Sequence, residues 1–162
     1  QAERNLKAFT HRAVGLRVVN DARYRASCAR YVLAKEVGKS DEIRLEIERA
    51  VTLWESESQR VIRLYQSRAG SYFESYSARR FLLDVRLRQA TFERNREAAD
   101  KLLRLRIMLA EEALPLLDPA DAFLRRQRPG IEWQMAFDRL SLERLRKDGV
   151  FPVDTAAAEL DG

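Results

Sequence analysis

Apolar residues along most of this chain recur every three or four positions, the spacing of one face of an α-helix. The first such pattern runs from about Ala2 to Val37, and Gly38 follows it as a residue that ends a helix at little conformational cost. Its predicted apolar face comprises Leu6, Phe9, Ala13, Leu16, Cys28, Tyr31 and Val32.

A second helix is predicted from Ser40, its N-cap, to about Gly70. Its apolar face comprises Ile43, Ile47, Ala50, Trp54, Val61 and Tyr65. Ser71 and Glu74 match a capping box, which indicates that a new helix starts there. The apolar rhythm nevertheless continues through Gly70, so one uninterrupted helix is the alternative interpretation.

A third helix is predicted from about residue 71 to Ala113, where Pro115 ends it. The sequence at 118–121, Asp-Pro-Ala-Asp, is typical of a helix start and predicts a short helix that stops near Gln127, before Pro129 and Gly130. A fourth helix of medium length is predicted over 131–147, with Gly149 as its terminator. Its apolar face carries Trp133, Phe137 and Leu140.

These elements predict an all-α fold: an elongated bundle of three long antiparallel helices plus a shorter C-terminal helical segment. The long helices would pack in the manner of a coiled coil. A helix of about 40 residues is roughly 60 Å long, whereas a compact globule of this size is about 40 Å across. We therefore expect two parts, a long-helix bundle over 1–113 and a C-terminal part over 114–162 packed on the bundle or on a partner.

Composition changes this picture mainly through charge. The net charge is +5, and residues 1–39 hold nine Lys and Arg against three Asp and Glu. No apolar run approaches the length needed to span a bilayer, so we predict no transmembrane segment. The single cysteine, Cys28, favours a reducing, intracellular compartment. The Arg-rich front and the absence of an initiator Met suggest a mitochondrial location, with a bacterial origin as the alternative.

The residues that usually carry catalysis are scarce. His11 and Cys28 are the only histidine and the only cysteine, and on one straight helix they would lie roughly 25 Å apart. Two such ligands are too few for a structural zinc site. We therefore predict that the chain is not an enzyme and has no catalytic residues, no cofactor and no metal site.

Two groups of residues suggest binding instead. Clustered arginines are candidates for an RNA or an anionic lipid surface, with a merely solvated surface as the alternative; they are Arg12, Arg17, Arg23, Arg25, Arg125, Arg126 and Arg128. Aromatic and arginine side chains concentrate binding energy at protein interfaces. The candidate partner-binding residues of this type are Tyr65, Tyr72, Phe73, Tyr76, Arg79 and Arg80, with ordinary packing between helices as the alternative. We expect this interface to be centred on Tyr72 and Tyr76.

The function that these patterns favour is a non-catalytic structural or accessory helical subunit whose partners are other protein subunits. The first alternative is an RNA-binding protein that uses the basic N-terminal helix. The second is a dimeric helical sensor or adaptor domain.

Overall fold

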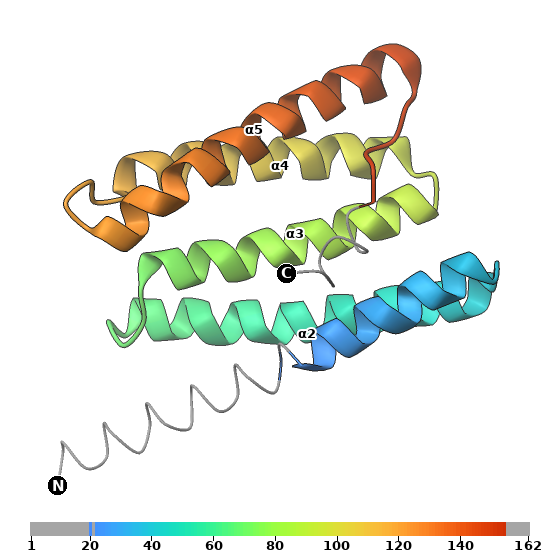
Figure 1. Ribbon diagram of the computed structural model, residues 1–162, viewed down its shortest axis with the longest axis horizontal. Coiled ribbons are helices and arrows are strands. Elements are labelled where there is room, and N and C mark those ends of the chain that lie inside the picture. Colours follow the sequence, from blue (N-terminus) through green and yellow to red (C-terminus); the bar gives the residue numbers. More distant parts are fainter. Residues whose placement is uncertain (1–19, 21, 155–162) are drawn as a thin grey trace, which may run out of the picture. The chain divides into compact units, whose positions relative to one another are not determined.

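The structure, a computed structural model, describes residues 20 and 22–154, and every regular element in that part of the chain is helical (Figure 1). Residues 22–36 form a helix, followed by α2 (Ser40–Gln66), α3 (Tyr72–Phe92) and α4 (Arg96–Ala113). A short 3-10 turn, η1 (Leu114–Leu116), leads to α5 (Ala122–Asp148). The prediction of an all-α fold is confirmed for these residues.

Two predicted helix boundaries are confirmed at atomic detail. Gly38 has a φ of +69°, the left-handed conformation that glycine adopts without strain, between residue 36 and the start of α2. Ser71 caps α3 by accepting from the Glu74 amide at 3.1 Å, while the Glu74 carboxylate accepts from the Ser71 amide at 3.2 Å. The chain therefore breaks near Gly70, and the alternative of one continuous helix is wrong.

The predicted third helix over 71–113 is wrong as a single element, because α3 and α4 are separate helices. Arg94 lies between them with a φ of +54°, outside the helical region, and Asn95 caps α4 by accepting from the Ala98 amide. The reversal allows Ala90 and Ala99 to be buried in the same apolar cluster. At 21 and 18 residues, α3 and α4 are about 32 and 27 Å long. Neither helix reaches the length of about 40 residues that was expected for the third helix.

The predicted short and medium helices at the C-terminus are one helix of 27 residues, as long as α2. Its N-cap is Asp121, the last residue of the start signal at 118–121, and Pro129 lies inside it. An internal proline removes one backbone hydrogen bond and crowds the preceding turn. The helix continues because residues on both sides of Pro129, Leu124 and Ile131, pack on the same apolar cluster. Gly149 ends it with a φ of +68°, as predicted.

The chain divides into two compact units, and the division falls within α2, between Leu53 and Trp54. The predicted boundary between 113 and 114 lies inside the second unit, Trp54–Asp154. In the first unit, Ser27 donates to both the backbone and the carboxylate of Glu46, and Arg30 donates to the same carboxylate at 2.9 Å. Its buried apolar residues include Tyr24, Cys28, Tyr31, Ala34, Ile43, Ile47 and Ala50. Positions 6–16 of the predicted first face lie outside the described residues.

The second unit has a core in three layers along α3, α4 and α5. One apolar cluster contains Tyr76, Leu109, Ala110, Ala113, Leu117 and Ile131. The other contains Leu87, Ala90, Ala99, Leu103 and Leu145. On each of α3, α4 and α5, charged residues lie in sequence between the positions that belong to the two clusters. We call these residues the ion ring: Arg80, Asp84, Arg106 and Asp138. On α5, Ile131, Asp138 and Leu145 are seven residues apart and form its buried face.

Candidate interaction surface

The predicted aromatic interface is not a single surface. Tyr76 is 4% exposed and belongs to the core, and Arg80 is equally buried in the ion ring. Tyr72 and Phe73 are half-buried, and Phe73 meets Phe123 edge-on with ring centroids 5.4 Å apart. The expectation of an interface centred on Tyr76 therefore needs correction, because that side chain fills the space between α3 and α4.

The remaining predicted partner-binding residues lie outside the core. Tyr65 is 43% exposed and contacts Tyr72 edge-on, with ring centroids 5.8 Å apart. Arg79 lies 4.0 Å from the Glu112 carboxylate, a loose, partly solvated ion pair. Tyr65 is on α2 and Tyr72 on α3, so the two rings meet from different helices.

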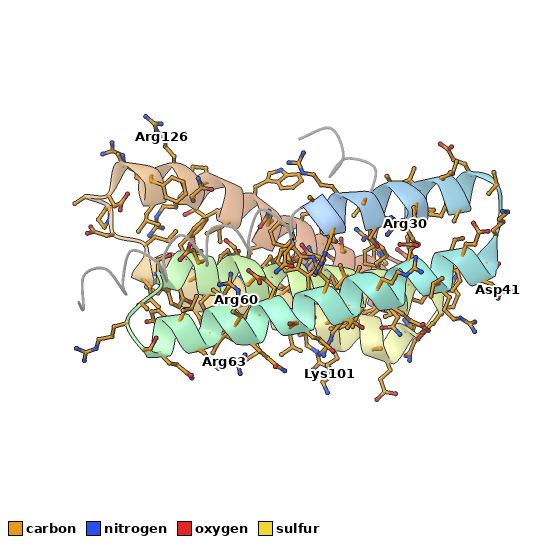
Figure 2. All side chains as sticks on the ribbon, turned by 90° about the horizontal axis from the view of Figure 1, so that it is seen from below. Arg30, Asp41, Arg60, Arg63, Lys101 and Arg126 are labelled. Carbon is orange, nitrogen blue, oxygen red and sulfur yellow. The ribbon has the colours of Figure 1, made fainter. Side chains whose placement is uncertain are left out.

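The predicted anion-binding arginines are scattered. Arg12 and Arg17 lie outside the described residues, and Arg23 and Arg25 are exposed in the first unit. Arg128 donates to the Leu114 carbonyl at 2.8 Å and pairs with Glu132 at 3.1 Å, so the second unit uses it internally. Arg125 and Arg126 are exposed, and Figure 2 shows the Arg126 side chain pointing away from the molecule.

The ion ring closes between three helices. Asp138 of α5 accepts from Arg80 Nη1 of α3 at 2.7 Å and lies 2.9 Å from Arg106 Nη2 of α4. Asp84 completes the ring at 3.3 Å from Arg80 Nε and 3.2 Å from Arg106 Nε. The two positive and two negative charges of the ring cancel. Of the four ion pairs in the ring, only the one between Arg80 and Asp138 also has hydrogen-bond geometry.

Burial is the main influence on the ionisation of this ring. It raises the pKa of the Asp138 carboxyl above its ordinary value, although the guanidinium groups of Arg106 and Arg80 oppose the shift. Burial also lowers the pKa of Arg106, against the attraction of Asp84 and Asp138. Both shifts disfavour the charged form, so mutual attraction does not fully offset the loss of hydration. We therefore expect the ring to contribute to helix register more than to net stability, which replacement of the whole ring tests.

The opposite face of α5 is apolar, with Trp133 and Leu140 exposed and Phe137 half-buried. Trp133 is 67% exposed, and its ring stacks on Phe137 with centroids 5.5 Å apart and an interplanar angle of 14°. Leu140 is 44% exposed and follows Trp133 by seven residues, which places it on the same helix face. We call Trp133, Phe137 and Leu140 the outer stripe.

Neither protein-family models, nor curated proteins, nor solved structures gave a match to this chain. Among residues 20 and 22–154, no three His, Cys, Asp or Glu side chains come together as a metal site. Within the same residues, every helix is too short or too polar to cross a bilayer.

The sequence pattern identified the outer stripe as an apolar face but did not identify it as a candidate site. The sequence analysis missed the significance of Asp138, which follows Phe137 directly. Ile131, Asp138 and Leu145 form a second set of residues at seven-residue spacing on α5, and either this set or the aromatic set could face the core. The structure buries the line that contains the aspartate, because arginines on α3 and α4 neutralise it, and leaves the aromatic line outside.

Proposed function

We propose that this chain is a non-catalytic helical subunit of a larger assembly, and that it acts through protein–protein contacts made by the outer stripe of α5. The observation that carries the proposal is the 67% exposure of Trp133 beside Phe137 and Leu140. Large exposed apolar side chains gathered on one face are typical of interaction sites. Tryptophan in particular concentrates binding energy at protein interfaces.

The rest of the second unit supports this proposal. The ion ring and the two apolar clusters hold α5 against α4 and α3, so the outer stripe stands on a well-fixed helix rather than on a loop. A rigid scaffold reduces the entropy lost when a partner binds.

Substitution of the stripe tests the proposal directly. Trp133→Ala in the full chain should reduce partner binding by about 2 kcal/mol or more, roughly 30-fold, and leave far-UV circular dichroism unchanged. The measurement is stoichiometric co-purification from the native source at moderate salt, followed by titration of the identified partner. The matched control is Met108→Ala, which removes an exposed apolar side chain from α4. Equal partner retention by Trp133→Ala and wild type would contradict the proposal.

An RNA-binding role is the second candidate, supported by the exposed Arg23, Arg25, Arg125 and Arg126. Binding to phosphates weakens steeply as ionic strength rises, because counterions are released on binding. Salt dependence therefore separates the two candidates: an apolar contact through Trp133 keeps its affinity at a salt concentration that dissociates an arginine–phosphate contact. A dimeric sensor or adaptor would show a Trp133-dependent dimer instead.

A further inference from the structure

The residues in line with the outer stripe on α5 are basic at both ends. Arg126 precedes Trp133 by seven residues, Arg144 follows Phe137 by seven, and Lys147 follows Leu140 by seven. These spacings place all of them on one helix face. The exposed face of α5 thus has an apolar centre and cations at both ends, about 27 Å apart from Arg126 to Arg144. We call Arg126, Arg144 and Lys147 the flanking cations.

The flanking cations differ from the other cations of α5 in their surroundings. Arg128, Arg139 and Arg146 each pair with a carboxylate, on Glu132, Glu111 and Asp100 respectively. No described carboxylate lies within ion-pair distance of Arg126, Arg144 or Lys147, and the same holds for Arg125 beside the stripe.

The four acidic residues of α5 do not pair with the flanking cations. Glu132 faces Arg128, and Asp138 is in the core. Glu143 is exposed at the margin of the stripe, three residues after Leu140, and Asp148 is exposed at the last position of the helix, four residues after Arg144. Neither of these two carboxylates lies within ion-pair distance of a flanking cation, so α5 leaves the cations of its outer face without a partner.

On the basis of the proposed function, we propose that the outer stripe binds an amphipathic helix of another protein whose apolar centre carries carboxylates at both ends. Such a helix covers Trp133, Phe137 and Leu140 while its acidic ends meet Arg126 at one end and Arg144 and Lys147 at the other. Two amphipathic helices would thus pair through their apolar faces, with charge complementarity setting the register.

Two other occupants fit this face less well. A second copy of α5 would place cations opposite cations at both ends, in either direction, and like charges opposite one another suppress pairing. A helix lying on a bilayer keeps its cations on the polar face, beside the apolar stripe. Here the cations continue the line of the stripe, so α5 lying flat would carry them toward the hydrocarbon.

A displayed library of 21-residue amphipathic helices, with a fixed leucine-rich stripe and randomised end residues, is a suitable probe for the full chain. Selection on wild type should enrich Glu and Asp at both ends. Selection on Arg126→Glu with Arg144→Glu should enrich Lys and Arg instead. A selected acidic peptide should bind the doubly reversed variant at least about tenfold more weakly than wild type at low salt. Arg44→Glu, an exposed charge reversal in the first unit, is the control and should leave peptide binding unchanged.

The outcomes separate this inference from the proposed function. Peptides that lose binding to Trp133→Ala but show no charge preference overturn the acidic partner and leave the stripe as an interface. Selected peptides that bind Trp133→Ala as well as wild type overturn both. Trp133-dependent binding to vesicles of phosphatidylserine and phosphatidylcholine, or a Trp133-dependent dimer in sedimentation equilibrium, also overturns the acidic-helix inference. Arg126→Gln with Arg144→Gln, which removes charge without reversing it, should lie between wild type and the reversed variant.

Discussion

The two faces of α5 reverse the usual distribution of residues in a helical protein. Its buried face carries a carboxylate, Asp138, that is inaccessible to solvent, whereas its exposed face carries Trp133 with two thirds of its surface in water. Carboxylates are seldom fully buried unless they are paired, and the two guanidinium groups of the ion ring supply that pairing. The same helix thus buries a charged residue inside the fold and exposes apolar surface outside it.

An apolar sequence pattern alone does not distinguish residues that pack in the core from residues that lie on a binding surface. Leu145 and Leu140 are five residues apart on one helix, but Leu145 is fully buried and Leu140 is 44% exposed. Residues on the inner face should determine the free energy of unfolding, and residues on the outer face should determine binding. Three single substitutions on α5, Asp138→Ala, Leu145→Ala and Leu140→Ala, test this division.

The largest effect is expected from Asp138→Ala. It leaves Arg80 and Arg106 buried near one another with only Asp84 between them, and breaking a buried pair in this way typically costs about 3–5 kcal/mol. Urea unfolding followed by circular dichroism measures the loss. Asp148→Ala, which removes an exposed carboxylate from the end of α5, should change stability by no more than about 0.5 kcal/mol.

Replacement of the entire ring is the informative companion to that experiment. A variant with Met at 80 and 106 and Leu at 84 and 138 should be about as stable as wild type, because the desolvation cost disappears together with the attraction. A large loss in this variant as well would show that the ring stabilises the fold outright, contrary to its assignment to register.

The next effect compares the two leucines under the same chemical change. Leu145→Ala should cost about 2–5 kcal/mol, because it opens a cavity in the apolar cluster around Leu103. Leu140→Ala should cost no more than about 0.5 kcal/mol. Thermal and urea unfolding of both variants gives the two values. Equal losses would show that the outer stripe is packed against something in the folded chain, which would contradict its role as a free surface.

The smallest effect concerns Tyr76, whose buried hydroxyl has no hydrogen-bond partner among the described residues. Burial raises the pKa of this tyrosine above its ordinary value of 10.0. Below pH 10 both folded and unfolded states keep the hydroxyl protonated, so the shift has no effect on stability there. As the pH rises further, the unfolded chain ionises first, and stability falls until the pH passes the folded-state pKa.

Tyr76→Phe should remove that dependence. The variant should be at least as stable as wild type at pH 7 and should lose less stability between pH 10 and 11, as judged from urea midpoints at each pH. Tyr65→Phe is the control, because it makes the same chemical change at a tyrosine that is 43% exposed. A profile for Tyr76→Phe that overlays wild type would indicate that the Tyr76 hydroxyl is hydrated in the folded state.

Local signals in the sequence predicted a good part of this fold. The capping box at Ser71 and the glycines at 38 and 149 act within a few residues of themselves, so their conformations follow from nearby sequence. The break at Asn95 was missed because the apolar rhythm continues across it, and the helix reverses in order to bury Ala90 against α4. Pro129 was read as a helix end because the packing of Leu124 and Ile131 on one cluster is a tertiary effect.

Prediction of the candidate site from the sequence depended even more on residues that are distant in the chain. Trp133, Phe137 and Leu140 were identified as one face, but whether that face is buried depends on the arginines of α3 and α4. Arg80 comes 58 positions before its partner Asp138, and nothing near either residue indicates the pairing. Tyr76 was assigned to an interface for the same reason, since its burial depends on Leu109 and Ala113 of α4.

The ion ring also determines how α5 is able to move. Sliding α5 by one helical turn, about 5.4 Å, would carry Asp138 away from both guanidinium groups at once and leave Asp84 as their only carboxylate in the ring. A core of leucines alone presents neighbouring registers at similar energy, whereas the ion ring favours the register in which Asp138 meets both arginines. A force applied at Trp133 by the proposed partner would reach Arg80 and Arg106 through Asp138. The three helices would then shift together as one lever rather than glide past one another.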